Sequence, residues 1–248
     1  TTSGTGSEVT SIAVITDKVN AVKIPLNDEL LIPDAAILDA RFTRTVPPHV
    51  TASTGMDVLT HAVEAYTSRH SNVFTAIYAE RAIRNVFTYL HRAYEQGDDM
   101  MARDNMLIGS CMAGLAFTNS GLGITHSMAH SLGGQFHIPH GLANAVLLPI
   151  VIDFNSFDAG VKYREIAEMA GLPAATVEEG TRNLVSAVRD LNASLGIPAR
   201  VRELKVDEGE YRRNLDAMAA NALEDICTQS NPRMPSHDDI VSLFERVW

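Results

Sequence analysis

Residues 123–149 read G-I-T-H-S-M-A-H-S-L-G-G-Q-F-H-I-P-H-G-L-A-N-A-V-L-L-P and hold four of the nine histidines of the chain. These four are His126, His130, His137 and His140. The stretch contains no lysine, arginine or carboxylate, so we expect it to be buried. Neutral imidazole is the commonest metal ligand among side chains, and it suits zinc, iron and copper. The stretch therefore predicts a metal site whose remaining ligands come from elsewhere in the chain.

Composition narrows the class of protein. The chain has 248 residues, of which 46% are hydrophobic and 20% charged, as in a globular protein with a sizeable core. The net charge of −10 argues against a nucleic-acid partner or an anionic membrane surface. No apolar run reaches the length of a membrane span. Two cysteines are too few for a disulfide framework, which favours a reduced, cytoplasmic protein.

From His49 onward the pattern of apolar residues has a helical period. Glycines and prolines divide it into segments. We expect helices at 50–66, from a cap at Ser71 to about Gln96, and at 101–117, 124–133, 142–154, 161–170, 177–195, 208–226 and 236–247. The predicted fold is mainly α, with an all-helical domain from residue 49 to 248.

The first 48 residues differ from the rest. Ser11–Thr16 and Leu30–Leu38 are rich in β-branched and aliphatic residues, and turn-forming residues separate them. We expect two or three short strands, with Pro33 restricting the second run to an edge or a bulge. Residues 1–48 therefore form a short β-rich lead.

The segment T-G-M-D-V-L-T-H-A-V-E at 54–64 supplies further candidate ligands. Asp57 and His61 are four residues apart and Glu64 follows three later, so the three share one face of a helix. Alone, the segment fits a hydrogen bond that orients a buried imidazole better than it fits a metal site. Together with the histidine-rich stretch it completes a set of nitrogen and oxygen donors.

Spacing alone does not decide which histidines are ligands. His126 and His130 are one helical turn apart, whereas His140 lies between Pro139 and Gly141 at a turn or a helix start. We interpret Asn144 as structural. The polar stretch 225–233 is interpreted as a connection between helices.

The opening loop, T-T-S-G-T-G-S-E-V-T, is rich in hydroxyls and glycine. Such a loop suits contacts to phosphate or ribose, although loops of this kind are common. Lys23 could add a cation for a cofactor, but an exposed lysine on a strand is the more frequent case. The chain starts inside this loop without a methionine, so we expect it to be part of a longer protein.

Five motifs together resemble the iron-containing, group III alcohol dehydrogenase family. They are T-T-S-G-T-G-S-E at 1–8, G-M-D-V-L-T-H-A-V-E-A-Y at 55–66, G-I-T-H-S-M-A-H-S-L-G-G at 123–134, I-P-H-G-L-A-N-A-V-L-L-P at 138–149 and N-P-R-M-P-S at 231–236. The likeness spans essentially the whole chain.

The resemblance implies roles for individual residues. It implies that Fe²⁺, or Zn²⁺ in its place, is bound by Asp57, His61, His126 and His140. It implies that His130 is the catalytic histidine, which relays a proton beside the nicotinamide. Contacts to NAD or NADP are implied for Thr1, Thr2, Thr5, Ser7, Thr10 and Lys23.

The fold implied is dehydroquinate-synthase-like: an α/β nucleotide-binding domain followed by the helical metal domain. Residues 1–48 would be the last strands of the first domain, whose G-G-G-S pyrophosphate-binding turn is absent from this sequence. The implied enzyme interconverts a primary alcohol and an aldehyde and forms a homodimer or larger homo-oligomer. We expect this chain to be inactive by itself. Alternatives are a glycerol dehydrogenase, a dehydroquinate-synthase-like enzyme, or a metal-binding domain without turnover.

Overall fold

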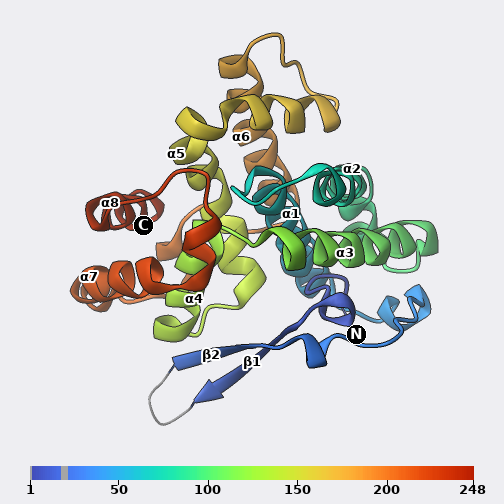
Figure 1. The fold of residues 1–248 in the computed structure, drawn as a ribbon, viewed down its shortest axis with the longest axis horizontal. Coiled ribbons are helices and arrows are strands. Elements are labelled where there is room, and N and C mark those ends of the chain that lie inside the picture. The colour runs from blue at the N-terminus through green and yellow to red at the C-terminus, as the bar shows by residue number, and fades with distance from the viewer. Residues whose placement is uncertain (1, 18–21) are drawn as a thin grey trace.

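A computed structural model describes residues 2–17 and 22–248. Within these ranges the chain forms eight α-helices, five short 3₁₀ segments and one two-stranded sheet (Figure 1). The predicted mainly α fold with a short β lead is therefore confirmed. The helices are α1 Pro48–Thr67, α2 Val73–Glu95, α3 Met100–Ser120, α4 Ile124–Phe136, α5 His140–Met169, α6 Val177–Ser194, α7 Glu208–Glu224 and α8 His237–Val247.

Helix α1 lies at the centre of the helices and packs against α2, α3 and α5. Its apolar residues are buried all around the helix, as expected for a helix with neighbours on every side. Gly55 allows one of these close contacts, because a Cβ there would lie 2.1 Å from a methyl carbon of Leu90 on α2. The central position matters because α1 carries Asp57, His61 and Glu64.

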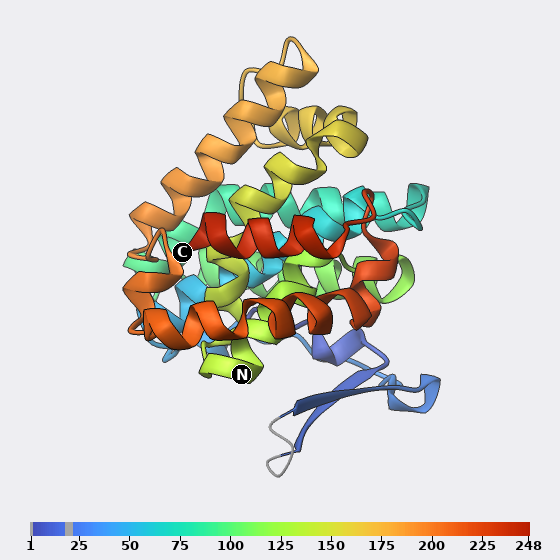
Figure 2. The same ribbon diagram turned by 90° about the vertical axis from the view of Figure 1, so that its left-hand side faces the viewer.

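Helix α5 is one continuous element, so the predicted break between 154 and 161 is wrong. Gly160 lies within the predicted break, and its role is close packing. A Cβ at this position would lie 2.7 Å from Val177 Cγ1 at the start of α6. The α5–α6 pair extends beyond the other helices (Figure 2). By length and composition α5 could cross a bilayer, but 72% of its apolar window is buried, as in the core helix of a globular protein.

The sheet is a hairpin of β1, Ile12–Asp17, and β2, Val22–Asn27, paired antiparallel. The first predicted strand is thus confirmed within one residue, whereas the strand predicted at 30–38 is wrong. Pro25 lies within β2 opposite Val14. A proline is tolerated there because each strand of a two-stranded sheet has one edge without a partner. The hairpin projects from one side of the helices (Figures 1 and 2).

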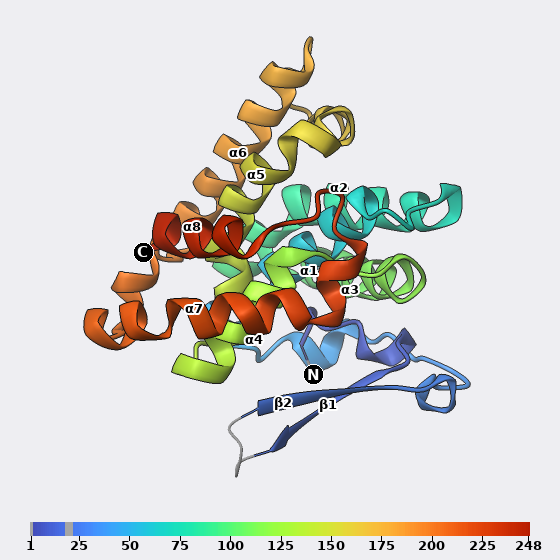
Figure 3. The same cartoon turned by 60° about the vertical axis from the view of Figure 1, so that its left-hand side comes forward.

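The predicted start of the second helix is displaced by one residue. Asn72, rather than Ser71, caps α2 and forms a reciprocal capping box with Thr75. Further along the chain, α7 packs against α4 and α8, and α8 also contacts α5. Helices α7 and α8 lie side by side (Figure 3), and α7 is the one that packs on α4. This arrangement brings the residues that follow α7 next to the histidines of α4.

Candidate metal centre

Three helices bring the four predicted ligands together. Asp57 and His61 come from consecutive turns of α1, His126 from the first turn of α4, and His140 from the first residue of α5. Each offers one ligand atom, and these four atoms lie within 4.8 Å of one another. Gly141 makes the close approach possible, because a Cβ there would lie 2.2 Å from the carbonyl oxygen of Ser53 on α1.

Two histidine nitrogens converge on one oxygen of Asp57. Nε2 of His140 lies 3.6 Å and Nε2 of His126 lies 3.8 Å from Asp57 Oδ1. Donors of a tetrahedral site, each about 2.1 Å from its ion, are about 3.4 Å apart. The observed separations are close to this value and too long for hydrogen bonds. The ring of His61 stacks on that of His126 with centroids 4.6 Å apart.

The site leaves buried imidazole nitrogens without hydrogen bonds. Among the described residues, neither Nε2 of His126 nor Nδ1 of His61 has a partner, and both atoms are shielded from solvent. Asp57, His61 and His126 are each at most 5% exposed. Buried polar atoms are normally paired, so the unpaired Nε2 of His126, which lies 3.8 Å from Asp57 Oδ1, fits an ion-binding site. A set of three histidines and one aspartate suits Fe²⁺ or Zn²⁺.

The charge states of Asp57 and His126 also suit a bound metal ion. Burial acts to raise the pKa of Asp57, but His61, His140 and His126, with a hydrogen bond from Asn144, hold it below its usual value. Burial, assisted by repulsion from His61 and His140, holds the pKa of His126 well below its usual value. The carboxylate is therefore ionised and the imidazole neutral, the forms in which each binds a metal.

Glu64, the third polar residue on the face of α1 that carries Asp57 and His61, connects α1 to the start of α4. Its Oε2 lies 2.6 Å from Nδ1 of His126. The carboxylate also accepts hydrogen bonds from the backbone N–H groups of Gly123 and Thr125 at 2.8 and 2.7 Å. Burial raises the pKa of Glu64 to about 7 despite these bonds. A carboxylate on the outer nitrogen of a ligating histidine fixes the ring and leaves the other nitrogen for the metal.

Asn144 also belongs to this centre, although we interpreted it as structural. Its Nδ2 donates to Asp57 Oδ1 at 2.7 Å and lies 3.1 Å from Nε2 of His140. It is fully buried, one helical turn after His140 on α5. The spacing of four residues was the available signal, since it places both side chains on one face of α5.

His130 lies beside the cluster and has a carboxylate of its own. Its Nδ1 is 2.7 Å from Asp225 Oδ2, and its ring stacks on that of His140 with centroids 5.3 Å apart. Burial acts to raise the pKa of Asp225, but the hydrogen bond and charge of His130 hold it below its usual value. Cys227 lies close by, and burial raises the pKa of its thiol. Residues 225–233, which we interpreted from the sequence as a connection between helices, therefore reach the site.

The N-P-R motif closes the same region. Asn231 is fully buried, and its Oδ1 accepts from the backbone N–H of Ile124 in the first turn of α4. Gly123, the N-cap of α4, has no capping side chain of its own. Glu64 and Asn231 supply the acceptors instead, from α1 and from the C-terminal part of the chain.

The opening loop packs against the helices. A Cβ on Gly6, which has a φ of 60°, would lie 2.8 Å from the Cα of Gly114 on α3. Gly4 is similarly close to Thr54 on α1. These glycines thus serve contacts within the chain. The predicted cofactor residues Thr2, Thr5, Ser7 and Thr10 lie in this loop, whereas Thr1 and the side chain of Lys23 lie outside the described residues.

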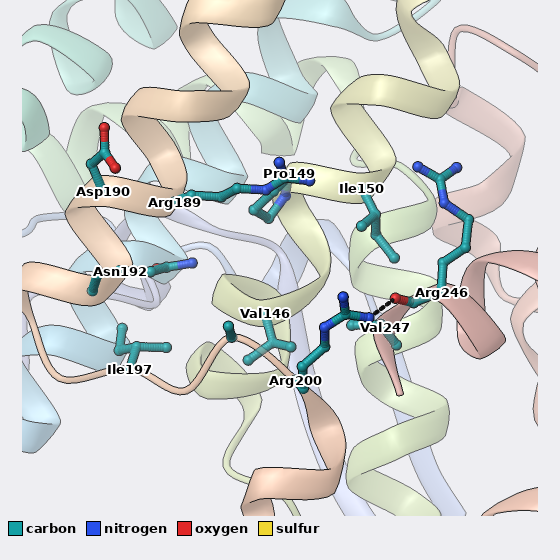
Figure 4. A pocket seen from close by; sticks show the side chains of 12 residues that line it. Val146, Pro149, Ile150, Arg189, Asp190, Asn192, Ile197, Arg200, Arg246 and Val247 are labelled. Carbon is teal, nitrogen blue, oxygen red and sulfur yellow. Dashed lines mark hydrogen bonds between the residues drawn. The ribbon is translucent and has the colours of Figure 1, made fainter.

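The cavities differ in their relation to the histidines. One of about 680 Å³ lies between α5, α6 and α8, is lined by Arg189, Arg200 and Arg246, and includes none of the predicted ligands (Figure 4). A smaller one of about 210 Å³ is bounded by Phe117 and Cys227. Phe117 stacks on His61 with ring centroids 4.6 Å apart, so the smaller cavity borders the centre.

Comparison with known proteins settles the family. A model of the C-terminal part of the iron-containing alcohol dehydrogenase family matches residues 51–248, and a second model, of iron-containing alcohol dehydrogenase, matches residues 1–40. The chain belongs to the iron-containing alcohol dehydrogenase family.

Relatives within this family bear the assignment out. The NADPH-dependent butanol dehydrogenase of Clostridium saccharobutylicum is 43% identical over 247 residues, which are 100% of this chain and 63% of that protein. The NAD-dependent methanol dehydrogenase of Bacillus methanolicus is 38% identical over 100% of the chain and 64% of its own length. The crystal structure of a 1,3-propanediol oxidoreductase superposes with a TM-score of 0.95 at 38% identity, over 100% of this chain and 64% of that chain.

The resemblance to iron-containing alcohol dehydrogenases noted from five motifs is thus confirmed over the whole chain. The chain spans less than two thirds of the length of each of these three relatives.

Proposed function

We propose that this chain provides the metal centre of an NAD(P)-linked dehydrogenase that interconverts small primary alcohols and aldehydes. The observation that carries the proposal is the convergence of Asp57, His61, His126 and His140. Within the part of the chain that the structure describes, His61 and His126 each keep one buried nitrogen without a hydrogen-bond partner. Membership of the iron-containing alcohol dehydrogenase family supports the class of reaction. The relatives, which include a butanol dehydrogenase and a methanol dehydrogenase, support the class of substrate.

A divalent ion in this centre would supply a Lewis acid for the alcohol or carbonyl oxygen. We propose Fe²⁺ as the ion. Zn²⁺ fits the same donors and binds them more tightly in the usual order of affinities, so metal supply decides between the two.

The surrounding residues would hold the donors in place. Glu64 fixes the ring of His126, and Asn144 donates a hydrogen bond to Asp57. His130 is the catalytic residue in this proposal: it accepts the proton of the alcohol during oxidation and returns it during reduction. Its side chain is 32% exposed, so it can exchange that proton with solvent.

The small cavity beside Phe117 and Cys227 supports a small substrate. Its volume of about 210 Å³ lies below the range of sites for drug-sized ligands. Its walls come from β1, α3 and the segment after α7. We propose that the alcohol carbon chain enters here.

For the cofactor, we propose contacts from Thr1, Thr2, Thr5, Ser7, Thr10 and Lys23. Residues 1–48 would belong to the nucleotide-binding part of the enzyme and 49–248 to the metal-binding part. The relatives named above include one NADPH-dependent and one NAD-dependent enzyme, so we propose NAD or NADP without choosing between them. We further propose a cytoplasmic enzyme that acts as a homodimer or larger homo-oligomer.

The test follows hydride transfer as absorbance at 340 nm. The chain, loaded anaerobically with Fe²⁺ or Zn²⁺, is assayed with NAD or NADP and 1-butanol, both alone and joined behind the N-terminal third of the butanol dehydrogenase. We expect turnover that requires the metal in at least the joined protein. Metal bound at one ion per chain without turnover in either protein would instead identify a metal-binding domain and contradict the proposed activity.

A further inference from the structure

Helix α4 carries two histidines, and each is paired with its own carboxylate. His126 lies 2.6 Å from Glu64, and His130 lies 2.7 Å from Asp225, in both cases through Nδ1. The two pairs differ in exposure, since the side chain of His126 is 1% and that of His130 is 32% exposed. The first pair belongs to the metal centre, which leaves the purpose of the second to be explained.

The carboxylate of Asp225 is held from two sides. Its Oδ1 accepts the backbone N–H of Cys227 at 2.9 Å and so caps the short 3₁₀ helix Ile226–Ser230. Ser127 Oγ lies 3.5 Å from the same oxygen. Because Oδ1 is anchored in this way, Oδ2 has a fixed position opposite His130. The ring of His130 is further fixed by its stacking on His140.

We propose that Asp225 is the positioning residue for His130. By accepting a hydrogen from Nδ1, it orients the ring and keeps the lone pair on Nε2, which then takes the proton of the alcohol and passes it to solvent. Asp225 thus acts only through His130. The inference rests on the proposed dehydrogenase function. It adds that Asp225 makes Nε2 the nitrogen of His130 that acts as the base.

A second metal ion is the rival explanation. His130, Asp225 and Cys227 also offer ligand atoms within 4.8 Å of one another. The distance between the nitrogen and the oxygen argues against it. At 2.7 Å it is a hydrogen-bond distance, shorter than the about 3.4 Å expected between two donors of one tetrahedral ion.

A second alternative is that Asp225 serves only as a helix cap. The substitution Asp225→Asn separates the two roles, since asparagine is an equally good N-cap. If the amide oxygen keeps the bond from the Cys227 N–H, the amide nitrogen faces His130 and donates to Nδ1. The proton of the ring then moves to Nε2, and the base is lost while the cap remains.

The first experiment records nitrogen-15 NMR spectra of the histidine rings in the Zn²⁺-loaded chain. The signals of His130 are assigned by their loss in His130→Ala. We expect a proton on Nδ1 in the unchanged protein and on Nε2 in Asp225→Asn. Asp207→Asn is the matched control, because Asp207 caps α7 through Glu210. It should leave His130 unchanged.

The second experiment measures kcat and KM of the protein that shows turnover in the alcohol assay. Asp225→Asn should lower kcat by about 10²- to 10⁴-fold with little change in KM, the range for loss of a general base. In a His130→Ala background the same substitution should have no further effect, since Asp225 acts only through that ring.

Three results would overturn the inference: a proton on Nε2 of His130 in the unchanged protein, additive effects of the two substitutions on kcat, or two metal ions per chain. The NMR result does not depend on turnover. The expected tautomers, without alcohol oxidation by either the chain alone or the joined protein, would therefore leave the pairing in place and refute the proposed function instead.

Discussion

Asn192 on α6 donates a hydrogen bond of 2.7 Å to the backbone carbonyl of Ala145 on α5. This carbonyl would normally accept from residue 149 in the helix, but residue 149 is a proline and has no N–H. Asn192 is 6% exposed and supplies the missing donor. The bond lies immediately after Asn144, so it supports the part of α5 that begins with His140.

Asn192→Ala should therefore destabilise the protein by about 1–3 kcal/mol, the cost of leaving a buried polar group without its partner. Urea unfolding followed by circular dichroism measures the effect. Asn183→Ala is the matched control, because Asn183 also lies on α6 and donates at 2.7 Å to a carbonyl, that of Pro173, but in an exposed place. Equal losses of stability in the two variants would contradict this account of the proline in α5.

Glu64→Gln should weaken metal binding by about 10- to 100-fold, the usual effect of removing a carboxylate from a ligating histidine. The amide also replaces an oxygen that accepts N–H groups at the start of α4. Competition with a chelator measures the dissociation constant. Glu165→Gln changes a carboxylate that binds the hydroxyl of Tyr66 instead. An unchanged dissociation constant in Glu64→Gln, or an equal change in both variants, would refute the role of Glu64.

The two histidines that stack on each other, His130 and His140, should respond differently to removal. His140→Ala should lose the metal, because it removes one of four proposed ligands. His130→Ala should keep the metal and lose turnover by about 10²- to 10⁴-fold. Plasma mass spectrometry of the desalted proteins gives the metal content. Equal depletion in both variants would show that the division between ligand and proton relay is wrong.

Gly114→Ala should disturb the opening loop without affecting the metal. A Cβ on Gly114 would lie 2.8 Å from Val9 Cγ2 and 2.9 Å from the carbonyl oxygen of Gly6. Overpacking of this kind costs about 1–3 kcal/mol. We expect a lower melting temperature and weaker NADPH fluorescence enhancement, with full metal content.

Gly209→Ala is the control for that substitution, since its new methyl group would meet the flexible end of Arg213 and the side chain of Asp207 on an exposed helix. A melting temperature that is unchanged in Gly114→Ala would mean that the loop does not pack on α3 as described.

Much of the helical part could be predicted from the sequence because helices such as α2 and α8 repeat their buried apolar residues at helical spacing on one face. The prediction failed where α5 was expected to break between residues 154 and 161. Gly160 and Pro149 lie inside α5, where contacts with α6 replace what an isolated helix would lack. Pro25 is tolerated within β2 because, among the described residues, one edge of this strand has no partner strand that would need a backbone N–H as donor.

The residues that support the histidines were harder to predict than the four proposed ligands. The spacing of Asp57 and His61 already places both on one face of α1. The contacts of Glu64 with His126, of Asn144 with Asp57 and of Asp225 with His130 join residues 62, 87 and 95 positions apart. These side-chain contacts cannot be predicted from helical periodicity or composition, because they form only when α1, α4, α5 and the segment after α7 pack together.

The central claim is that Asp57, His61, His126 and His140 hold one divalent ion. Its most direct test is anaerobic titration of the chain with Fe²⁺, followed by desalting and plasma mass spectrometry, with an intact mass on the same sample. We predict one iron per chain, and none in a variant that combines Asp57→Ala with His61→Ala. Iron absent from the unchanged chain, or retained at one per chain by the double variant, would contradict the claim.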